Sequence, residues 1–302
     1  MLAIIAPGQG SQTPGMLNSW VTNPVFHELL SKWSMRIDLD LIGLGTKADA
    51  DEIKDTANAQ PLIVAASLLG AHALGIKNFA YTSGHSVGEL AAAAISGAIC
   101  DEDALRLVRA RGIEMAKAAA ISPAGMSAVL GGDRDVVLKK LEELKLVAAN
   151  DNGGGQIVAA GDLAALAALS ENPPEGARVR ALAVAGAFHT SFMEPAVEPL
   201  RTLAATIQTA PTTISVISNK DGEVVSDGGE VLTRIVNQIA NPVRWDLCMQ
   251  TLKNLGVTGV IELPPAGTLV GLLKRGAPEI ETFALKSADD LSAAKEFAGR
   301  HA

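Results

Sequence analysis

One short stretch places a serine between the glycines that a nucleophile needs. Residues 84–88 read Gly-His-Ser-Val-Gly, the pattern G-x-S-x-G, between an extended run and an Ala-rich helical run. A sharp strand-to-helix turn lifts a serine hydroxyl clear of the backbone, and flanking glycines leave room for that turn. The first N–H groups of the following helix, notably that of Val87, then point at the place where an oxyanion would form. Ser86 is therefore the predicted nucleophile of an acyl transfer or hydrolysis.

A nucleophilic serine needs a base, and the chain offers five histidines. His189 follows a predicted strand, lies in a loop and precedes a helix, which is where α/β folds place site residues. His72 falls in a buried helical run, His27 on a polar helix, His301 near the end of the chain and His85 beside the serine. A single loop histidine is often a structural or surface residue, so the pattern ranks His189 first without assigning it.

An arginine lies on the apolar face of a predicted helix. Residues 101–120 begin with three acids in the first turn and carry apolar residues at i, i+3, i+4 spacing, and Arg111 shares their face. A guanidinium that faces the core is costly unless it is paired. Arg111 is therefore expected either in an internal salt bridge or in contact with an anionic ligand.

The composition limits the fold and the partners. Of 302 residues, 48% are hydrophobic and 19% charged, which is enough for a full core. The net charge of −8 argues against nucleic acid, because phosphates are bound mainly by Lys and Arg. Cys100 and Cys248 lack metal-ligand spacing, so we expect free buried thiols and no metal. Residues 1–6 lack the basic region of a signal peptide, and the apolar run 62–76 is interrupted, so a soluble cytoplasmic protein without a membrane span is expected.

The alternation of strand and helix patterns predicts an α/β fold. Apolar runs typical of buried parallel strands occupy residues 2–6, 78–81, 213–217 and 257–262. Helical patterns lie between and after them, at 23–35, 49–58, 61–76, 90–95, 101–120, 231–240, 245–255 and 268–275. A parallel sheet covered by helices, with Ser86 in the turn after a strand, is the hydrolase-like arrangement that contains a nucleophile elbow.

Residues 122–186 show a different order of predicted strands and helices from the rest of the chain. Their patterns follow the order β-α-β-β-α-β, which is the split βαβ, ferredoxin-like arrangement. We therefore expect an inserted small domain at 122–186 and a main domain formed by residues 1–121 and 187–302. The inner face of the small domain is expected to wall one side of the cleft at Ser86.

Several motifs together resemble the malonyl-CoA:acyl carrier protein transacylases of fatty acid synthesis, over essentially the whole chain. Residues 7–12 match the family's P-G-Q-G-S-Q, residues 84–89 its G-H-S-x-G-E, residues 111–112 its R-G and residues 241–245 its N-P-V-x-W. The family's late E-L-G-P-G turn is replaced by Glu-Leu-Pro-Pro-Ala-Gly at 262–267. The local geometry of that turn is therefore expected to differ.

The resemblance implies a role for each matching residue. Ser86 would be acylated and His189 would be its general base, oriented by the backbone carbonyl of Arg244. The backbone N–H groups of Gln9 and Val87 would form the oxyanion hole.

The resemblance also implies a substrate pocket. Arg111 would hold the free carboxylate of the malonyl group, and Gln60, Met115 and Phe188 would line the pocket around it. A bulky residue before the histidine, here Phe188, is the pattern that the family associates with malonyl rather than methylmalonyl units.

By the same resemblance, the chain would move a malonyl group from malonyl-CoA to the pantetheine thiol of acyl carrier protein, for fatty acid or polyketide synthesis. The CoA thioester would be a substrate, and no bound cofactor and a monomeric state are expected. A serine hydrolase or thioesterase would show the same elbow, although Arg111 argues against it. The non-enzymatic alternative is a silent module that only docks carrier protein.

Docking needs a local basic patch. Acyl carrier proteins are acidic and CoA carries phosphates, so the net charge of −8 opposes both encounters. The candidates are Arg178 and Arg180, on the strand leading out of the small domain, and Lys274 and Arg275, at the end of a helix. The alternative is that each is an ordinary solvated surface charge.

Overall fold

Two sheets organise the protein, which we describe from a computed structural model of residues 1–302. The larger sheet has the strand order β11-β10-β1-β2-β7-β8, and all neighbours are parallel except β7 and β8. Its strands are β1 (Leu2–Ala6), β2 (Tyr81–Gly84), β7 (Ser215–Ile217), β8 (Val224–Val225), β10 (Gly259–Glu262) and β11 (Glu281–Ala284). The carboxyl ends of the central parallel strands β1 and β2 therefore lie at the same edge of the sheet.

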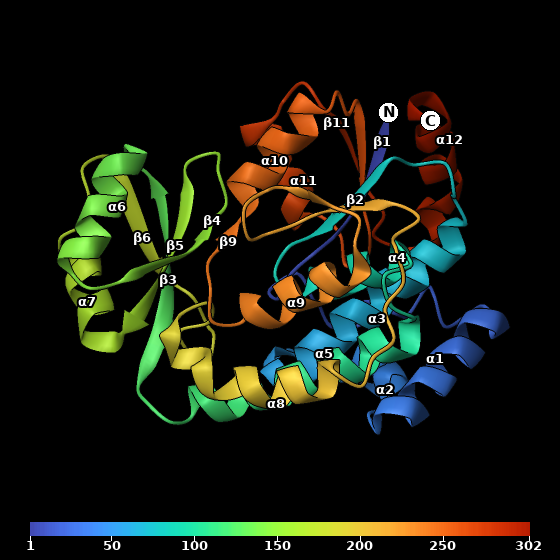
Figure 1. Ribbon diagram of the computed structural model, residues 1–302, viewed down its shortest axis with the longest axis horizontal. Helices are drawn as coiled ribbons and strands as arrows, with labels where there is room; N and C mark the ends of the chain where they lie inside the picture. Colours follow the sequence, from blue (N-terminus) through green and yellow to red (C-terminus); the bar gives the residue numbers. More distant parts are fainter.

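Helices cover both faces of this sheet (Figure 1). Alternate residues of β1 enter two separate cores, because successive strand residues point to opposite faces. One core is completed by α10 (Trp245–Asn254) and α11 (Thr268–Gly276). The larger core is completed by α1 (Pro24–Ile37), α2 (Leu41–Thr46), α3 (Thr56–Leu74), α4 (Gly88–Ile95), α5 (Asp101–Ala119), α8 (Glu194–Ala204), α9 (Gly228–Gln238) and α12 (Leu291–His301).

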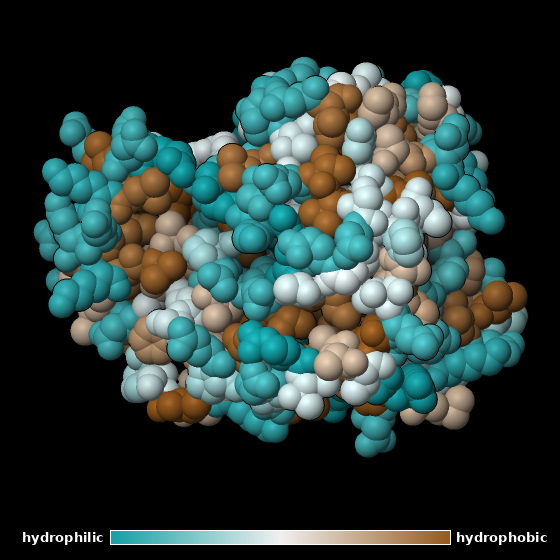
Figure 2. Space-filling model, viewed as in Figure 1, coloured by the Kyte–Doolittle hydropathy of each residue, from teal (hydrophilic) through white to brown (hydrophobic).

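The second sheet lies to one side, with two helices on its outer face (Figure 1). Its order is β6-β3-β5-β4-β9. The elements are β3 (Ala124–Gly131), α6 (Arg134–Glu143), β4 (Val147–Asp151), β5 (Gln156–Asp162), α7 (Leu163–Glu171), β6 (Ala177–Ala181) and β9 (Val243–Arg244). Val129 and Ile157 pack against α6 and α7 in a small core of their own. In Figure 2 the outer helices are hydrophilic, and hydrophobic residues gather over the strands beside them.

Four local predictions were wrong, among them the position at which α3 begins. The strand expected at 78–81 begins only at Tyr81, and the helix expected at 49–58 is limited to the 3-10 turn Glu52–Lys54 and the start of α3. Cys100 is exposed, whereas Cys248 is buried as expected. The other short 3-10 turns are Ser191–Met193 and Ala288–Asp290.

Helix α3 begins before Pro61 rather than at it. Proline has no N–H for the carbonyl four residues earlier, which is that of Ala57. Arg109 Nη1 donates to this carbonyl at 2.8 Å, so a neighbouring helix replaces the missing bond. By length and composition α3 is also able to cross a membrane, but 72% of that stretch is buried inside the protein, as in a core helix.

Candidate active site

Ser86 occupies the tight turn between β2 and α4. Its φ is +52°, a left-handed conformation that is unusual for a residue with a Cβ. A Cβ at Gly84 would lie 2.0 Å from the carbonyl carbon of Gly88, and one at Gly88 would lie 2.3 Å from the oxygen of Ala6. Both positions therefore require glycine. Asn219 Oδ1 accepts a hydrogen bond from the Ser86 N–H at 2.8 Å and holds the turn.

His189 meets this serine. Ser86 Oγ lies 2.7 Å from His189 Nε2, and His189 Nδ1 lies 2.8 Å from the backbone carbonyl of Gln238. A carbonyl can only accept, so Nδ1 carries the proton and Nε2 is free to accept from the serine. Burial and the charge of Arg111 lower the pKa of His189 to about 3, so the ring is neutral at pH 7.

The residue that orients His189 differs from the prediction. The prediction of the Arg244 carbonyl was wrong, because the acceptor belongs to Gln238. Gln238 is the last residue of α9, and the last carbonyls of a helix have no partner within the helix. The Arg244 N–H instead donates to the Asn219 carbonyl at 2.7 Å, and its guanidinium pairs with Asp246 at 2.7 Å.

Arg111 is buried beside the serine. It is 2% exposed, and its guanidinium donates to Gln60 Oε1 at 2.7 Å, Gln238 Oε1 at 3.0 Å and Ser86 Oγ at 3.3 Å. All three acceptors are uncharged, and the Nε–H has no partner. Burial lowers the pKa of Arg111 to about 10, which still leaves it charged at neutral pH. The internal salt bridge expected as one alternative is therefore absent, and the arginine stays available to an anion.

A cavity of about 200 Å³ opens beside Ser86 and His189, and Arg111 is not among the residues that line it. Gln9, Ser86 and His189 line it from the larger part of the protein, and the second sheet contributes Met126 and Val158. The remaining lining residues are Gly8, His85, Ala128, Asn150, Asn152, Gln156, Leu182, Val184, Phe188, Thr268, Leu269 and Leu272. The backbone N–H groups of Gln9 and Val87 donate to no carbonyl of the protein, so both are free to bind an oxyanion.

The chain is similar to known proteins in sequence and in fold. The acyl transferase domain model matches residues 4–295. Malonyl CoA-acyl carrier protein transacylase of Mycobacterium tuberculosis is 52% identical over 296 residues, which cover 96% of this chain and 98% of the relative. The chain belongs to the malonyl CoA-acyl carrier protein transacylase family. It is an acyltransferase.

Solved structures of the transacylase family have the same fold as this chain. The crystal structure of MCAT from Mycobacterium tuberculosis superimposes with a TM-score of 0.94 at 51% identity, covering 98% of this chain and 99% of that one. A malonyl-transacylase in complex with a type II PKS acyl-carrier protein has a TM-score of 0.91 at 29% identity, covering 98% of this chain and 99% of that one.

The other predicted residues of the acyltransferase fall into two groups. Phe188 lines the cavity, whereas Gln60 and Met115, which were expected to line it too, are buried outside its lining, and Gln60 Nε2 lies 3.5 Å from Met115 Sδ. The basic candidates are all exposed: Arg178 and Arg180 on β6, Lys274 and Arg275 at the end of α11. Sequence reasoning gave no role to Glu89 and did not consider Asn219 or the side chain of Gln238.

Proposed function

We propose that the protein transfers a malonyl group from malonyl-CoA to the pantetheine thiol of acyl carrier protein through a malonyl ester on Ser86. The observation that carries this proposal is Arg111, a buried cation with uncharged partners 3.3 Å from the Ser86 hydroxyl. In a malonyl group one methylene separates the carbonyl from the carboxylate. An acyl group bound to Ser86 would therefore bring the missing anion to Arg111.

The two half-reactions use the same groups in opposite directions. His189 Nε2 takes the proton from Ser86 as the hydroxyl oxygen attacks the thioester carbonyl, and Gln9 and Val87 N–H groups stabilise the oxyanion. The C–S bond then breaks, and His189 returns the proton to the CoA sulfur. The pantetheine thiol next gives its proton to His189 and attacks the ester, and Ser86 leaves with that proton. The Gln238 carbonyl stabilises the imidazolium in both halves.

A serine hydrolase or thioesterase is the enzymatic alternative, and the rates of transfer and hydrolysis distinguish it. We expect malonyl transfer from malonyl-CoA to holo acyl carrier protein to exceed malonyl-CoA hydrolysis without acceptor by orders of magnitude. A thiol is the better nucleophile, and an acyl group fixed by Arg111 occupies the cavity that water would need. Hydrolysis as fast as transfer would overturn the proposal.

The same proposal includes the division of the chain into domains, its cellular location and its oligomeric state. We divide it into a ferredoxin-like small domain at 122–186 and a hydrolase-like main domain formed by 1–121 and 187–302. The order β3-α6-β4-β5-α7-β6 supports this division, while β9 is a strand that the later part of the chain adds to the small sheet. We place the enzyme in the cytoplasm as a monomer, with no bound cofactor or metal.

We propose four exposed basic residues, Arg178, Arg180, Lys274 and Arg275, as the docking surface for acyl carrier protein and CoA, although none of them lines the cavity itself. Arg180 pairs opposite Ala128 and Arg178 opposite Leu130 across β6 and β3. Directly opposed residues point to the same face of a sheet, and Ala128 lines the cavity. On the other side, a Cβ at Gly154 would lie 3.0 Å from the Cβ of Arg275, so the end of α11 packs on the β4–β5 loop.

Reversing both charges on β6 should weaken docking. We expect Arg178→Glu with Arg180→Glu to raise the KM for carrier protein by about 3- to 30-fold at low salt, because the reversed charges repel an acidic partner. The wild-type KM should also rise with salt, whereas the variant should respond less. Lys139→Glu with Lys140→Glu on α6 changes the net charge equally and should leave the KM unchanged. An unchanged KM in the first variant would remove β6 from the docking surface.

A further inference from the structure

A buried carboxylate lies beneath the nucleophile turn and has no part in the mechanism above. Glu89, in the first turn of α4, is 2% exposed. Its Oε1 accepts from the Asn219 N–H at 2.6 Å, and its Oε2 accepts a short hydrogen bond from Gln238 Nε2. Both donors are uncharged, so the carboxylate has no ion-pair partner. Burying a carboxylate without an ion-pair partner lowers the stability of the folded protein. We therefore expect the contacts of Glu89 to have a function that offsets this cost.

Each donor to Glu89 also holds part of the active site. Asn219 Oδ1 accepts from the Ser86 N–H, and Asn219 Nδ2 donates to the Gly84 carbonyl at 2.8 Å, so this residue clamps both ends of the turn. Gln238 Oε1 accepts from Arg111 Nη2 at 3.0 Å, and the Gln238 carbonyl accepts from His189. Glu89 is thus one residue removed from the serine, the histidine and the arginine.

The direction of these hydrogen bonds matters most at Gln238. An amide side chain has one donor end and one acceptor end, and an ionised carboxylate can only accept. The Gln238 nitrogen therefore faces the carboxylate and its oxygen faces Arg111. The Ser86 carbonyl and Asn219 Oδ1 also accept from this nitrogen, each at 3.2 Å, and Glu89 accepts the shortest of the three hydrogen bonds. With the amide reversed, its N–H groups would face the guanidinium donors, and Arg111 would lose an acceptor.

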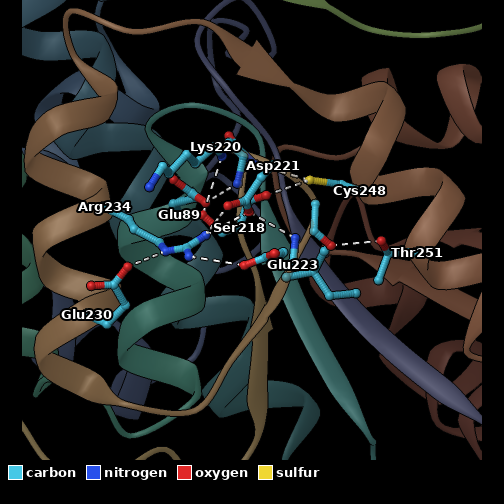
Figure 3. Close-up of polar contacts among 12 residues, drawn as sticks. Glu89, Ser218, Lys220, Asp221, Glu223, Glu230, Arg234, Cys248 and Thr251 are labelled. Carbon is cyan, nitrogen blue, oxygen red and sulfur yellow. Dashed lines mark hydrogen bonds and ion pairs between the residues drawn. The ribbon is translucent and has the colours of Figure 1, made fainter.

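The cations nearest to Glu89 are engaged elsewhere. Figure 3 shows Glu89 next to the network of Arg234, whose Nη1 contacts the two carboxylate oxygens of Asp221 at 2.7 and 2.9 Å. Arg234 Nε also donates to Glu230 at 2.7 Å. Cys248 packs on the other side as a buried thiol whose pKa burial raises. The surroundings thus leave Gln238 and Asn219 as the groups that Glu89 holds.

We propose that Glu89 is a positioning residue that determines specificity. Its ionised carboxylate orients Gln238 so that the amide oxygen keeps Arg111 in place for the carboxylate of the acyl group, and it anchors Asn219 under Ser86. This inference rests on the proposed function, because it assigns Arg111 to the malonyl carboxylate. It gives a role to the last residue of the G-H-S-x-G-E motif, which the mechanism leaves unused.

The test compares two acyl donors in the Glu89→Gln variant. The new amide can accept from the Asn219 N–H only by turning its own NH₂ toward the Gln238 NH₂, so two donors face each other. This removes the shortest hydrogen bond that holds the Gln238 amide and leaves only the weaker ones to the Ser86 carbonyl and Asn219 Oδ1. We expect kcat/KM for malonyl transfer to fall about 10- to 100-fold, because the hydrogen bond that orients Arg111 is lost. Acetyl transfer, which needs no carboxylate contact, should fall at least about fivefold less. Glu223→Gln, an exposed acid of the Arg234 network, removes the same charge and should change neither rate.

A second arm uses the pH dependence of the wild-type enzyme. Burial raises the pKa of Glu89 to about 7, although hydrogen bonds from Asn219 and Gln238 and the charges of Arg111 and Arg234 oppose this rise. Only the ionised form orients Gln238, so the ratio of malonyl to acetyl transfer should decrease as the pH falls from 8 to 6. The ring of His189, with its pKa lowered to about 3, does not titrate in that range. In Glu89→Gln the ratio should be low and independent of pH.

The outcomes separate this inference from the function on which it rests. Malonyl transfer by the wild type at pH 8 tests the function by itself. An equal loss of malonyl and acetyl transfer in Glu89→Gln would make Glu89 purely structural and overturn the inference. A wild-type ratio that does not change between pH 8 and 6 would also overturn it, and this arm requires no variant to fold.

Discussion

Replacing Ser86 with alanine should lower malonyl transfer by at least about 10,000-fold, because the hydroxyl that His189 activates is the only nucleophile that the protein supplies in the proposed mechanism. Incubation of the wild type with labelled malonyl-CoA should place one stable label on Ser86, and Ser86→Ala should carry none. Mass spectrometry of peptides from the quenched protein measures both.

Three comparisons support the interpretation of that loss. Ser127→Ala removes a buried hydroxyl from β3 and should retain full activity and labelling. Ser86→Ala should still bind carrier protein, which separates loss of chemistry from loss of docking. Ser86→Gly should be equally inactive yet more stable than Ser86→Ala, since glycine adopts a φ of +52° without strain. A stable label on another residue, or residual label in Ser86→Ala, would contradict the assignment of the nucleophile.

The proposed nucleophile and the buried arginine could be found in the sequence because their signals are local. The G-x-S-x-G pattern marks a turn in which Gly84 and Gly88, only four positions apart, approach too closely for a Cβ at Gly84. Arg111 was visible because a charge on an apolar helix face is unusual. These local patterns singled out Ser86 and Arg111 and ranked His189 first among the histidines, and the structure places both of the other side chains within hydrogen-bond distance of the Ser86 hydroxyl.

The supporting residues escaped prediction because their contacts are distant in the chain. Glu89 meets Asn219 across 130 positions and Gln238 across 149. The Gln238 carbonyl orients His189 because α9 ends there, and helix ends are the least certain feature of a sequence pattern. The wrong expectation for Arg244 lay six residues beyond that end. The role of Pro61 depended likewise on Arg109 from another helix.

Removing the side chain of Arg111 should change the preferred acyl group. The malonyl carboxylate would lose a charge-assisted contact worth about 1.5 to 3 kcal/mol, so Arg111→Ala should reduce kcat/KM for malonyl transfer about 10- to 150-fold more than for acetyl transfer. Arg111→Lys should be intermediate, because an ammonium keeps the charge but cannot reproduce the planar contacts to Gln60, Gln238 and a carboxylate. Arg106→Ala, on the same helix with its guanidinium paired to Asp103, is the matched control and should alter neither rate.

The loss in Arg111→Ala should be confined to the diacid substrate for a second reason. The charge of Arg111 lowers the pKa of His189, so its removal raises that pKa and makes the ring a stronger base toward Ser86. Acetyl transfer should therefore be retained or increased. On the acid side of its pH profile, kcat should begin to fall at a higher pH than in the wild type, because the base is protonated at a higher pH. Equal losses for both donors would mean that Arg111 only supports the fold, since a structural defect cannot distinguish a carboxylate from a methyl group.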